Sequence, residues 1–373
     1  MRTPSSTAVG IREYVAMLLI IIGVKLADST PALYFDSLLS ASWMGPLIGG
    51  IIAAIPIYFL IKVMKLYKDQ HIHDVIVHLF GKILGISISF LFWLYGSVVI
   101  AVDTRSYVDI ISTLYFVKTP TIAIFILMMV ACAYTAMKGI QHLGSLSWLV
   151  LAYIKIVLAF ALFLSIKEAN FYAIFPFWGP GIKEIMIESV FKTSLYGDIA
   201  YMGLIFPFLA SNKVFTKGTW IALAILTVEI TISFLLFIFM FDYMSVSILS
   251  FPFHELTRYI GIGTFLSNID TLFFPFWVVA SLIRFSVYLY LNALLFGYIF
   301  KVKKYIYAIP IFASVYLIIG MIPETPSFTI YKLRDPLYQI FSPVFIALPI
   351  LMWIIAKIRG DVRSETNKGS VKI

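Results

Sequence analysis

Long apolar stretches recur from one end of the chain to the other, and this repetition constrains the fold more than any single motif. Gly45–Val63, Leu143–Ile166 and Thr219–Tyr243 are examples, each close to the roughly 20 apolar residues that a helix needs to cross a bilayer. Only 13% of the residues are charged and 61% are apolar, which leaves too little polar surface to cover a water-soluble domain. The sequence therefore predicts a polytopic membrane protein. It excludes a cytosolic enzyme, a nucleic-acid-binding module and a secreted disulfide-rich domain.

Ten stretches are predicted to cross the membrane as helices. The segment before the first one is polar, and the apolar stretch after it is too long for a signal peptide and lacks a clear cleavage site, so we expect a true span there. The ten are Tyr14–Tyr34, Gly45–Val63, Ile83–Phe116, Thr121–Met137, Leu143–Ile166, an interrupted stretch within Glu184–Ala210, Thr219–Tyr243, Thr264–Phe300, Ile306–Ile322 and Leu337–Ala356.

The basic residues set the expected orientation. With the N-terminus in the cytoplasm, 17 of the 28 lysines and arginines fall in cytoplasmic segments and 7 in external ones, Lys332 and Arg334 among the latter. Cytoplasmic loops carry such an excess. The predicted topology places both termini in the cytoplasm, requires an even number of spans, and makes residues 358–373 a cytoplasmic tail.

The spans divide into two halves with the same rhythm, residues 12–166 and 184–357. The first span of each half is interrupted, and Gly23 and Gly197 lie 174 residues apart at the two interruptions. Five spans per half would place the second half upside down relative to the first. The predicted fold is thus an all-α polytopic membrane protein with a 5+5 inverted repeat and broken helices 1 and 6. Such paired breaks point to a binding site near the midplane, although a break can also be a simple kink packed by its neighbours.

Several segments resemble the spore germination permease family, the B subunits of GerA-type germinant receptors, within the amino acid–polyamine–organocation (APC) superfamily. The resemblance extends over about residues 11–359 and rests on Ile22–Leu26 with Pro31, Ser42–Pro46, Arg258–Gly261, Asn268–Asp270, Phe276–Trp277 and Arg284–Tyr288. It implies a LeuT/APC-like fold, a small nutrient ligand, expected to be an amino acid, and A-type and C-type receptor subunits as partners. It also implies location in the spore inner membrane.

The ligand-binding candidates lie at the breaks and on the facing spans. A charge at membrane depth is costly unless it is paired or wet, Gly197 allows close approach of the chain, and Arg284 and Tyr288 share a helix face at spacing four. The predicted pocket is Gly23, Lys25, Tyr95, Val99, Gly197, Asp198, Tyr201, Arg284 and Tyr288. The alternative for Lys25 is a structural pair with Asp28, three residues further along.

Other buried charges are open to two interpretations. Lys155 has no carboxylate within a turn; the resemblance implies a proton-coupling role for a fifth-span lysine, and a pair with Glu229 is the alternative. Asp103, Arg105 and Asp109 are expected to form either a structural ion-pair network or an outer gate.

Neither a catalytic constellation nor a cofactor site is predicted. The sequence has no recognisable nucleophile–base set or phosphate-binding glycine loop, and Cys132 is its one cysteine. His71, His73, Asp74 and His78 resemble a metal site, but a solvated cytoplasmic loop is the favoured interpretation. Two functions remain: a nutrient sensor that shifts between conformations, or a proton-coupled amino acid permease. A scaffold that binds nothing is a third possibility.

Overall fold

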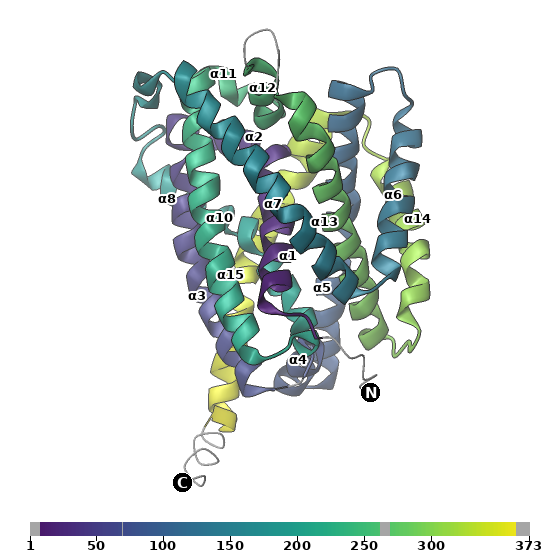
Figure 1. The fold of residues 1–373 in the computed structure, drawn as a ribbon. Coiled ribbons are helices and arrows are strands. Elements are labelled where there is room, and N and C mark those ends of the chain that lie inside the picture. The colour runs from purple at the N-terminus through teal and green to yellow at the C-terminus, as the bar shows by residue number, and fades with distance from the viewer. Residues whose placement is uncertain (1–7, 69, 262–268, 363–373) are drawn as a thin grey trace.

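The computed structural model describes residues 8–68, 70–261 and 269–362 of the chain. Within these ranges the protein is built from helices, and the one β-type contact is an isolated bridge between Val9 and Leu209. That bridge sets the entrance of the first helix beside the end of the interrupted stretch in the second half. The helices run roughly parallel to one another and form a single bundle (Figure 1).

The α-helices follow the predicted spans closely. In chain order they are α1 Ile11–Gly23, α2 Thr30–Leu38, α3 Met44–Leu66, α4 Ile72–Phe80, α5 Lys82–Ile110, α6 Thr121–Met137, α7 Ile140–Ser165, α8 Ile182–Phe191, α9 Asp198–Tyr201, α10 Asn212–Phe241, α11 Tyr243–Ser247, α12 Pro252–Tyr259, α13 Asp270–Ile299, α14 Ala308–Gly320 and α15 Asp335–Ile358.

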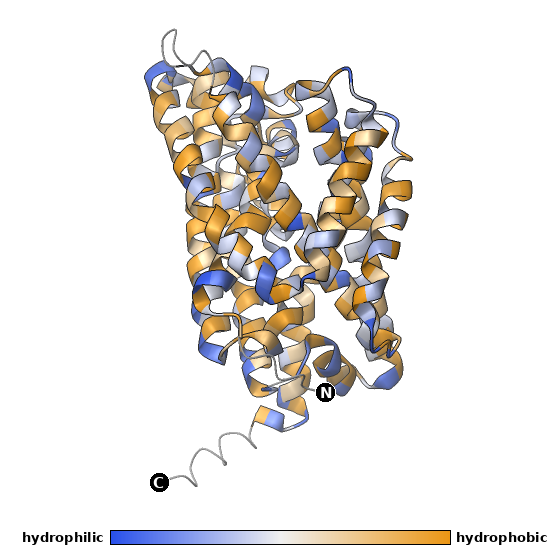
Figure 2. Ribbon diagram, turned by 45° about the vertical axis from the view of Figure 1, so that its right-hand side comes forward, coloured by the Kyte–Doolittle hydropathy of each residue, from blue (hydrophilic) through white to orange (hydrophobic). Residues whose placement is uncertain are grey.

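Six helical stretches of the described chain are long and apolar enough to cross a membrane, and the bent pair α1–α2 makes a seventh. Two shorter apolar helices, Thr121–Met137 and Tyr305–Gly320, occupy the positions of the fourth and ninth predicted spans. Apolar side chains such as Leu127, Leu149 and Ile156 lie exposed on the outside of the bundle, where a bilayer would cover them. Hydrophobic residues predominate along most of the helices (Figure 2). The protein is therefore an integral, multi-pass membrane protein, and the total of ten spans stays a prediction.

Helix α1 forms the centre of the bundle. It packs against α7, α10 and α13, and its residues from Ala16 to Ile22 are all buried. The burial of this whole run means that other helices enclose the second half of α1. The first break therefore lies inside the bundle and not at its lipid-facing surface.

The tenth span begins earlier than predicted. A π-helical segment, Phe328–Arg334, runs directly into α15, so the span starts near Phe328 and not at Leu337. Lys332 and Arg334 therefore lie in a helix and not in a loop, and Arg334 is only 1% exposed. Their placement on the external side stays a prediction. The eighth predicted span begins at Thr264, but residues 264–268 lie outside the described residues. The repeat boundaries at 12–166 and 184–357 stay predictions.

Candidate functional site

The first break separates α1 from α2 by a bend of 57°. A 3₁₀ turn, Val24–Ala27, follows α1, and the carboxylate of Asp28 then accepts a hydrogen bond of 2.6 Å from the backbone N–H of Thr30. Pro31 at the start of α2 has no N–H to leave unsatisfied. The sequence thus ends one helix and begins another here, and the short unwound stretch between them carries Lys25.

The second break is longer and consists of short helical pieces. A 3₁₀ turn, Thr193–Tyr196, follows α8, the four-residue helix α9 begins after Gly197, and a 3₁₀ segment with Pro207 follows it. The backbone here is satisfied from other segments: the Ser194 N–H donates to Ser342 Oγ at 2.9 Å, and Lys25 Nζ donates to the Leu195 carbonyl at 3.1 Å. Lys25 therefore connects the two breaks.

Six charged side chains form a continuous chain of ion pairs across the break region. Lys25 Nζ lies 2.8 Å from Asp198 Oδ2, which is 3.4 Å from Arg284 Nη1. Arg284 Nη2 donates to Asp103 Oδ2 at 2.6 Å, and the other Asp103 oxygen lies 3.1 Å from Arg334 Nε. Arg334 Nη2 ends the chain on Asp28 Oδ2 at 2.8 Å. We call this set the charge chain.

The charge chain is balanced and buried. Its three basic and three acidic residues are each at most 8% exposed. Removing one member leaves an uncompensated buried charge, which costs about 3–5 kcal/mol for a buried pair. Two further bonds hold it in place, since Tyr288 donates to Asp198 and Arg284 donates to the Ile21 carbonyl at the end of α1.

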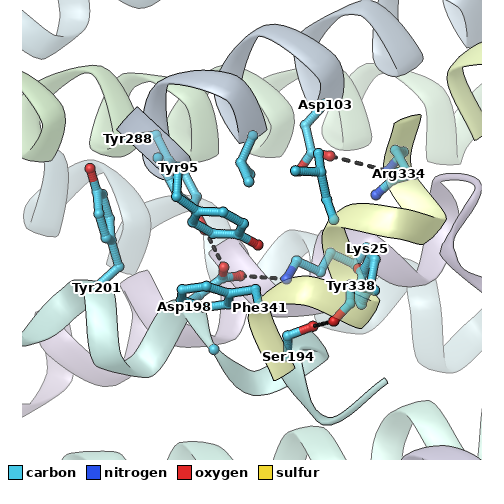
Figure 3. Close-up of a pocket in the computed structure, with 14 residues that line it drawn as sticks. Lys25, Tyr95, Asp103, Ser194, Asp198, Tyr201, Tyr288, Arg334, Tyr338 and Phe341 are labelled. Carbon is cyan, nitrogen blue, oxygen red and sulfur yellow. Dashed lines mark hydrogen bonds and ion pairs between the residues drawn. The ribbon is translucent and has the colours of Figure 1, made fainter. Parts of the chain in front are cut away.

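A small cavity lies against this chain, between the two breaks (Figure 3). Lys25 and Asp198 face each other at its wall, and the rings of Tyr95 and Phe341 stack beside them with their centroids 3.9 Å apart. The full lining is Lys25, Tyr95, Gly96, Val99, Asp103, Ser194, Gly197, Asp198, Tyr201, Tyr288, Arg334, Leu337, Tyr338 and Phe341. Its free space of about 30 Å³ holds two or three waters at ~10–15 Å³ each.

Seven of the nine predicted pocket residues line this cavity. They are Lys25, Tyr95, Val99, Gly197, Asp198, Tyr201 and Tyr288. Arg284 lies behind the wall, bonded to Asp103 and Asp198, so its guanidinium does not stand free to clamp a ligand. Gly23 faces a different cavity, between α1, α7 and α13, with Glu229 of α10 also in its lining.

Gly197 is tightly packed. A Cβ atom built on it would lie 2.8 Å from the ring of Phe341 and 3.0 Å from the Ser194 carbonyl oxygen. Contacts this short force a neighbour to move, so a large residue at this position would disturb the break whether or not a ligand binds there. Smaller changes elsewhere in the lining are cleaner probes.

The alternative pairing of Lys25 with Asp28 is not formed, and Asp103 does not pair with Arg105. Lys25 does not pair with Asp28: the 3₁₀ turn changes their register, so Lys25 meets Asp198 and Asp28 meets Arg334. Arg105 pairs with Asp109 at 2.8 Å, one turn away on the same helix. Asp103 points to another face of α5 and joins the charge chain. Arg334 was missed because Lys332 to Pro336 has the composition of a loop, and Tyr338 and Phe341 were missed because nothing local marks which face of the tenth span meets the breaks.

Lys155 and Glu229 form a separate ion pair beside the first break. Lys155 Nζ lies 2.5 and 2.6 Å from the two oxygens of Glu229, and a Cβ on Gly23 would lie 3.3 Å from that nitrogen. The two side chains are 25% and 12% exposed. This is the pairing that the sequence left as the alternative for Lys155.

The histidine-rich segment is a packed helix, so the expectation of a solvated loop is wrong. Ile72, Val75, Ile76 and Leu79 are buried along one face of α4. His73 Nδ1 lies 2.8 Å from Ser89 Oγ, and His71 is stacked on Tyr298. Burial lowers the pKa of both imidazoles. No group of three His, Cys, Asp or Glu side chains in the described residues is arranged to hold a metal ion.

The fold is that of an integral membrane protein in which two interrupted helices meet at a small cavity. The chain matches the family described as spore germination protein over residues 14–329. Because that match covers most of its length, the chain belongs to the spore germination protein family, as the resemblance predicted.

Individual relatives agree with this assignment. Spore germination protein KB of Bacillus subtilis (strain 168) is 25% identical over 268 residues, which are 70% of this chain and 72% of the relative. Spore germination protein GerLB of Bacillus cereus is 26% identical over 91% of both chains.

The similarity of this chain to solved structures shows its fold and nothing more. A Na⁺-coupled sialic acid symporter in a substrate-bound outward-open state has a TM-score of 0.58 at 14% identity and matches 91% of this chain and 84% of its own. The manganese transporter of Eremococcus coleocola has the same TM-score at 13% identity, over 91% and 77%. These similarities confirm the predicted LeuT/APC-like fold class.

Proposed function

We propose that the chain is the nutrient-sensing membrane subunit of a spore germinant receptor, and that the cavity between the two breaks binds a small zwitterion, an amino acid being the expected class. The observation that carries the proposal is the Lys25–Asp198 ion pair, which joins the two breaks at the cavity wall. A zwitterion would place its carboxylate on Lys25 and its ammonium on Asp198. This exchange keeps the site neutral, so no charge is left buried alone.

Binding requires the cavity to grow. About 30 Å³ of free space is well below the ~300–1,000 Å³ of typical small-molecule sites. The contacts that hold the cavity closed come from the tenth span. Arg334 donates a hydrogen bond to Asp28, and Tyr338 Oη lies 3.2 Å from Thr30 Oγ1. We infer that these contacts, which join Asp28 and the start of α2 to the start of the tenth span, form the gate, and that a ligand shifts the population toward a conformation in which they are broken.

The names of the relatives support membership of a receptor complex. In this proposal the ligand-induced conformation is detected by A-type and C-type subunits in the spore inner membrane, and both termini of this chain lie in the cytoplasm. Co-purification of the chain with those subunits tests the assembly separately from ligand binding.

The experiment that tests the ligand assignment is a thermal-unfolding screen of the purified chain against amino acids, sugars and nucleosides. A compound that binds only the folded state raises its apparent stability by mass action. A hit among the amino acids that is lost in Lys25→Met supports the proposal. A hit that survives this change, or stabilisation by uncharged sugars alone, contradicts the zwitterion assignment.

A proton-coupled amino acid permease is the second candidate. The Lys155–Glu229 pair favours it, because it lies against Gly23 at the first break, where a change of protonation would reach the site. Uptake of the screened compound into proteoliposomes separates the two functions. Saturable, pH-driven uptake that is lost in Lys155→Met identifies a permease, and binding without uptake identifies a sensor.

A further inference from the structure

A large groove opens on the outer side of the bundle, away from the charge chain. It lies between α6, α13 and the π-helical end of α5 (Ile111–Tyr115) and has a volume of about 630 Å³. Its lining is Ile111, Phe116, Thr119, Ala123, Ile124, Leu127, Met128, Ala131, Phe274, Pro275, Val278, Ser281 and Leu282. We call it the lateral groove.

The chemistry of the lateral groove suits hydrocarbon. Of its lining residues only Thr119 and Ser281 have polar side chains, and the Ser281 hydroxyl already donates to the Trp277 carbonyl at 2.7 Å. Leu127, at its edge, is 73% exposed. A groove of this composition at membrane depth offers a ligand dispersion contacts and almost no hydrogen bonds.

The two ends of the groove differ. At one end α6 and α13 touch, with Cys132 Sγ 3.6 Å from the Leu282 carbonyl oxygen, so the groove closes there. At the other end lie Thr119 and its neighbour Lys118, both exposed in the connection between α5 and α6. A cation at this end attracts an anionic head group at the membrane surface by Coulomb interaction.

The geometry points to one occupant, and we propose that the lateral groove binds an acyl chain of an anionic phospholipid, with the phosphate at Lys118 and Thr119. From Ala123 to Ala131 the groove follows α6 for about 12 Å at 1.5 Å per residue, a stretch that part of one acyl tail fills. A partner transmembrane helix fits less well, because it must pass through the whole membrane and the contact at Cys132 blocks its path.

An occupant of the lateral groove would contact the residues that hold α12 in place. Phe274 in the groove wall stacks on Tyr115 at 3.7 Å between centroids. The Tyr115 hydroxyl donates to Asp270 and lies 2.7 Å from Nδ1 of His254 in α12. Burial lowers the pKa of His254 to about 3, so this imidazole is neutral. A bound acyl chain would thus support the packing that holds α12 against α13.

The test uses the full chain in phosphatidylcholine nanodiscs that contain a phosphatidylglycerol probe with a photoreactive diazirine in its acyl chain. Cross-linked peptides are mapped by mass spectrometry. We expect labelling of the groove residues of α6 and α13 to exceed that of the lipid-facing surface of α7 several-fold. Unlabelled phosphatidylglycerol should compete better than unlabelled phosphatidylcholine.

Matched variants make the result specific. Ala131→Trp, or Ala123→Trp if the first folds poorly, fills the groove and should abolish the excess labelling, while Ala159→Trp on the exposed face of α7 should preserve it. Lys118→Glu should remove the preference for phosphatidylglycerol, and Lys183→Glu on α8, far from α6 in Figure 1, should retain it.

Two outcomes overturn the proposal. Equal labelling of the α6–α13 groove and the α7 surface would show ordinary bulk lipid contact. Loss of groove labelling when A-type and C-type subunits are co-assembled, with cross-links from Leu127 to a partner chain, would assign the groove to a protein partner.

Discussion

The two ionic groups beside the first break are built differently. In the charge chain each of the four inner residues has partners on two sides, and Arg284 alone bonds Asp103, Asp198 and the Ile21 carbonyl. Lys155 and Glu229 form a simple pair, and the lysine side chain is 25% exposed. Partners can therefore be exchanged within the charge chain, whereas the Lys155–Glu229 pair can only be made or broken. For this reason we propose a ligand with both charges for the charge chain and a proton for the Lys155–Glu229 pair.

Arg284→Met should have the largest effect. It leaves two buried carboxylates facing each other without their shared cation, at a cost of about 3–5 kcal/mol or more. We expect a large fall in the yield of monodisperse protein and in its unfolding temperature. Arg258→Met is the control, because its pair with Glu255 is exposed and such pairs contribute at most about 1 kcal/mol. An Arg284→Met protein as stable as wild type would show that the charge chain does not hold the breaks together.

Glu229→Gln should have a smaller effect of about 1.5–3 kcal/mol, the usual contribution of a charged hydrogen bond. The double variant Lys155→Met with Glu229→Gln should recover most of this loss, because it removes both charges. A double-mutant cycle on unfolding free energies measures the recovery. Strict additivity of the two changes would mean that Lys155 and Glu229 do not interact in the membrane.

Tyr338→Phe tests the proposed gate between α2 and α15. It removes the hydroxyl that lies 3.2 Å from Thr30 Oγ1, so the closed conformation loses about 1 kcal/mol. If α2 and α15 form the gate, the nutrient concentration for half-maximal germination should fall by about fivefold. An increase in that concentration would instead make Tyr338 a ligand contact.

Substitution of Asp361 should have the smallest effect on stability, because this side chain is 30% exposed. It lies 2.6 Å from the Tyr67 hydroxyl and 3.3 Å from His78 Nε2, and the bond from Tyr67 holds its pKa below the ordinary value. The stabilisation is present above pH 3.8, the ordinary pKa, and is lost as pH falls through the folded-state pKa. Asp361→Asn should change the unfolding temperature by no more than a degree or two. Hydrogen exchange at the end of α4 should detect the loosening, and unchanged exchange would show that the contact is not formed.

Local patterns predicted the breaks but not their connections. Gly23, Asp28 and Pro31 interrupt one apolar stretch, and Gly197 and Asp198 interrupt another, so both breaks were found. The partners of Lys25 and Asp28 lie on other helices, 173 and 306 residues away, and no local spacing encodes such contacts. Arg334 was missed because Lys332 to Pro336 has the composition of a loop.

We propose that a ligand enters between the two breaks, and two neighbouring valines of α5 provide the test. Val99 lines the cavity, whereas its neighbour Val98 is exposed on the outside of the bundle. Thermal stabilisation by the amino acid hit should be measured for wild type, Val99→Phe and Val98→Phe. If the ligand binds in the cavity, Val99→Phe should abolish this thermal stabilisation, and the Val98→Phe protein should still show it. Equal stabilisation of both variants would place the ligand elsewhere.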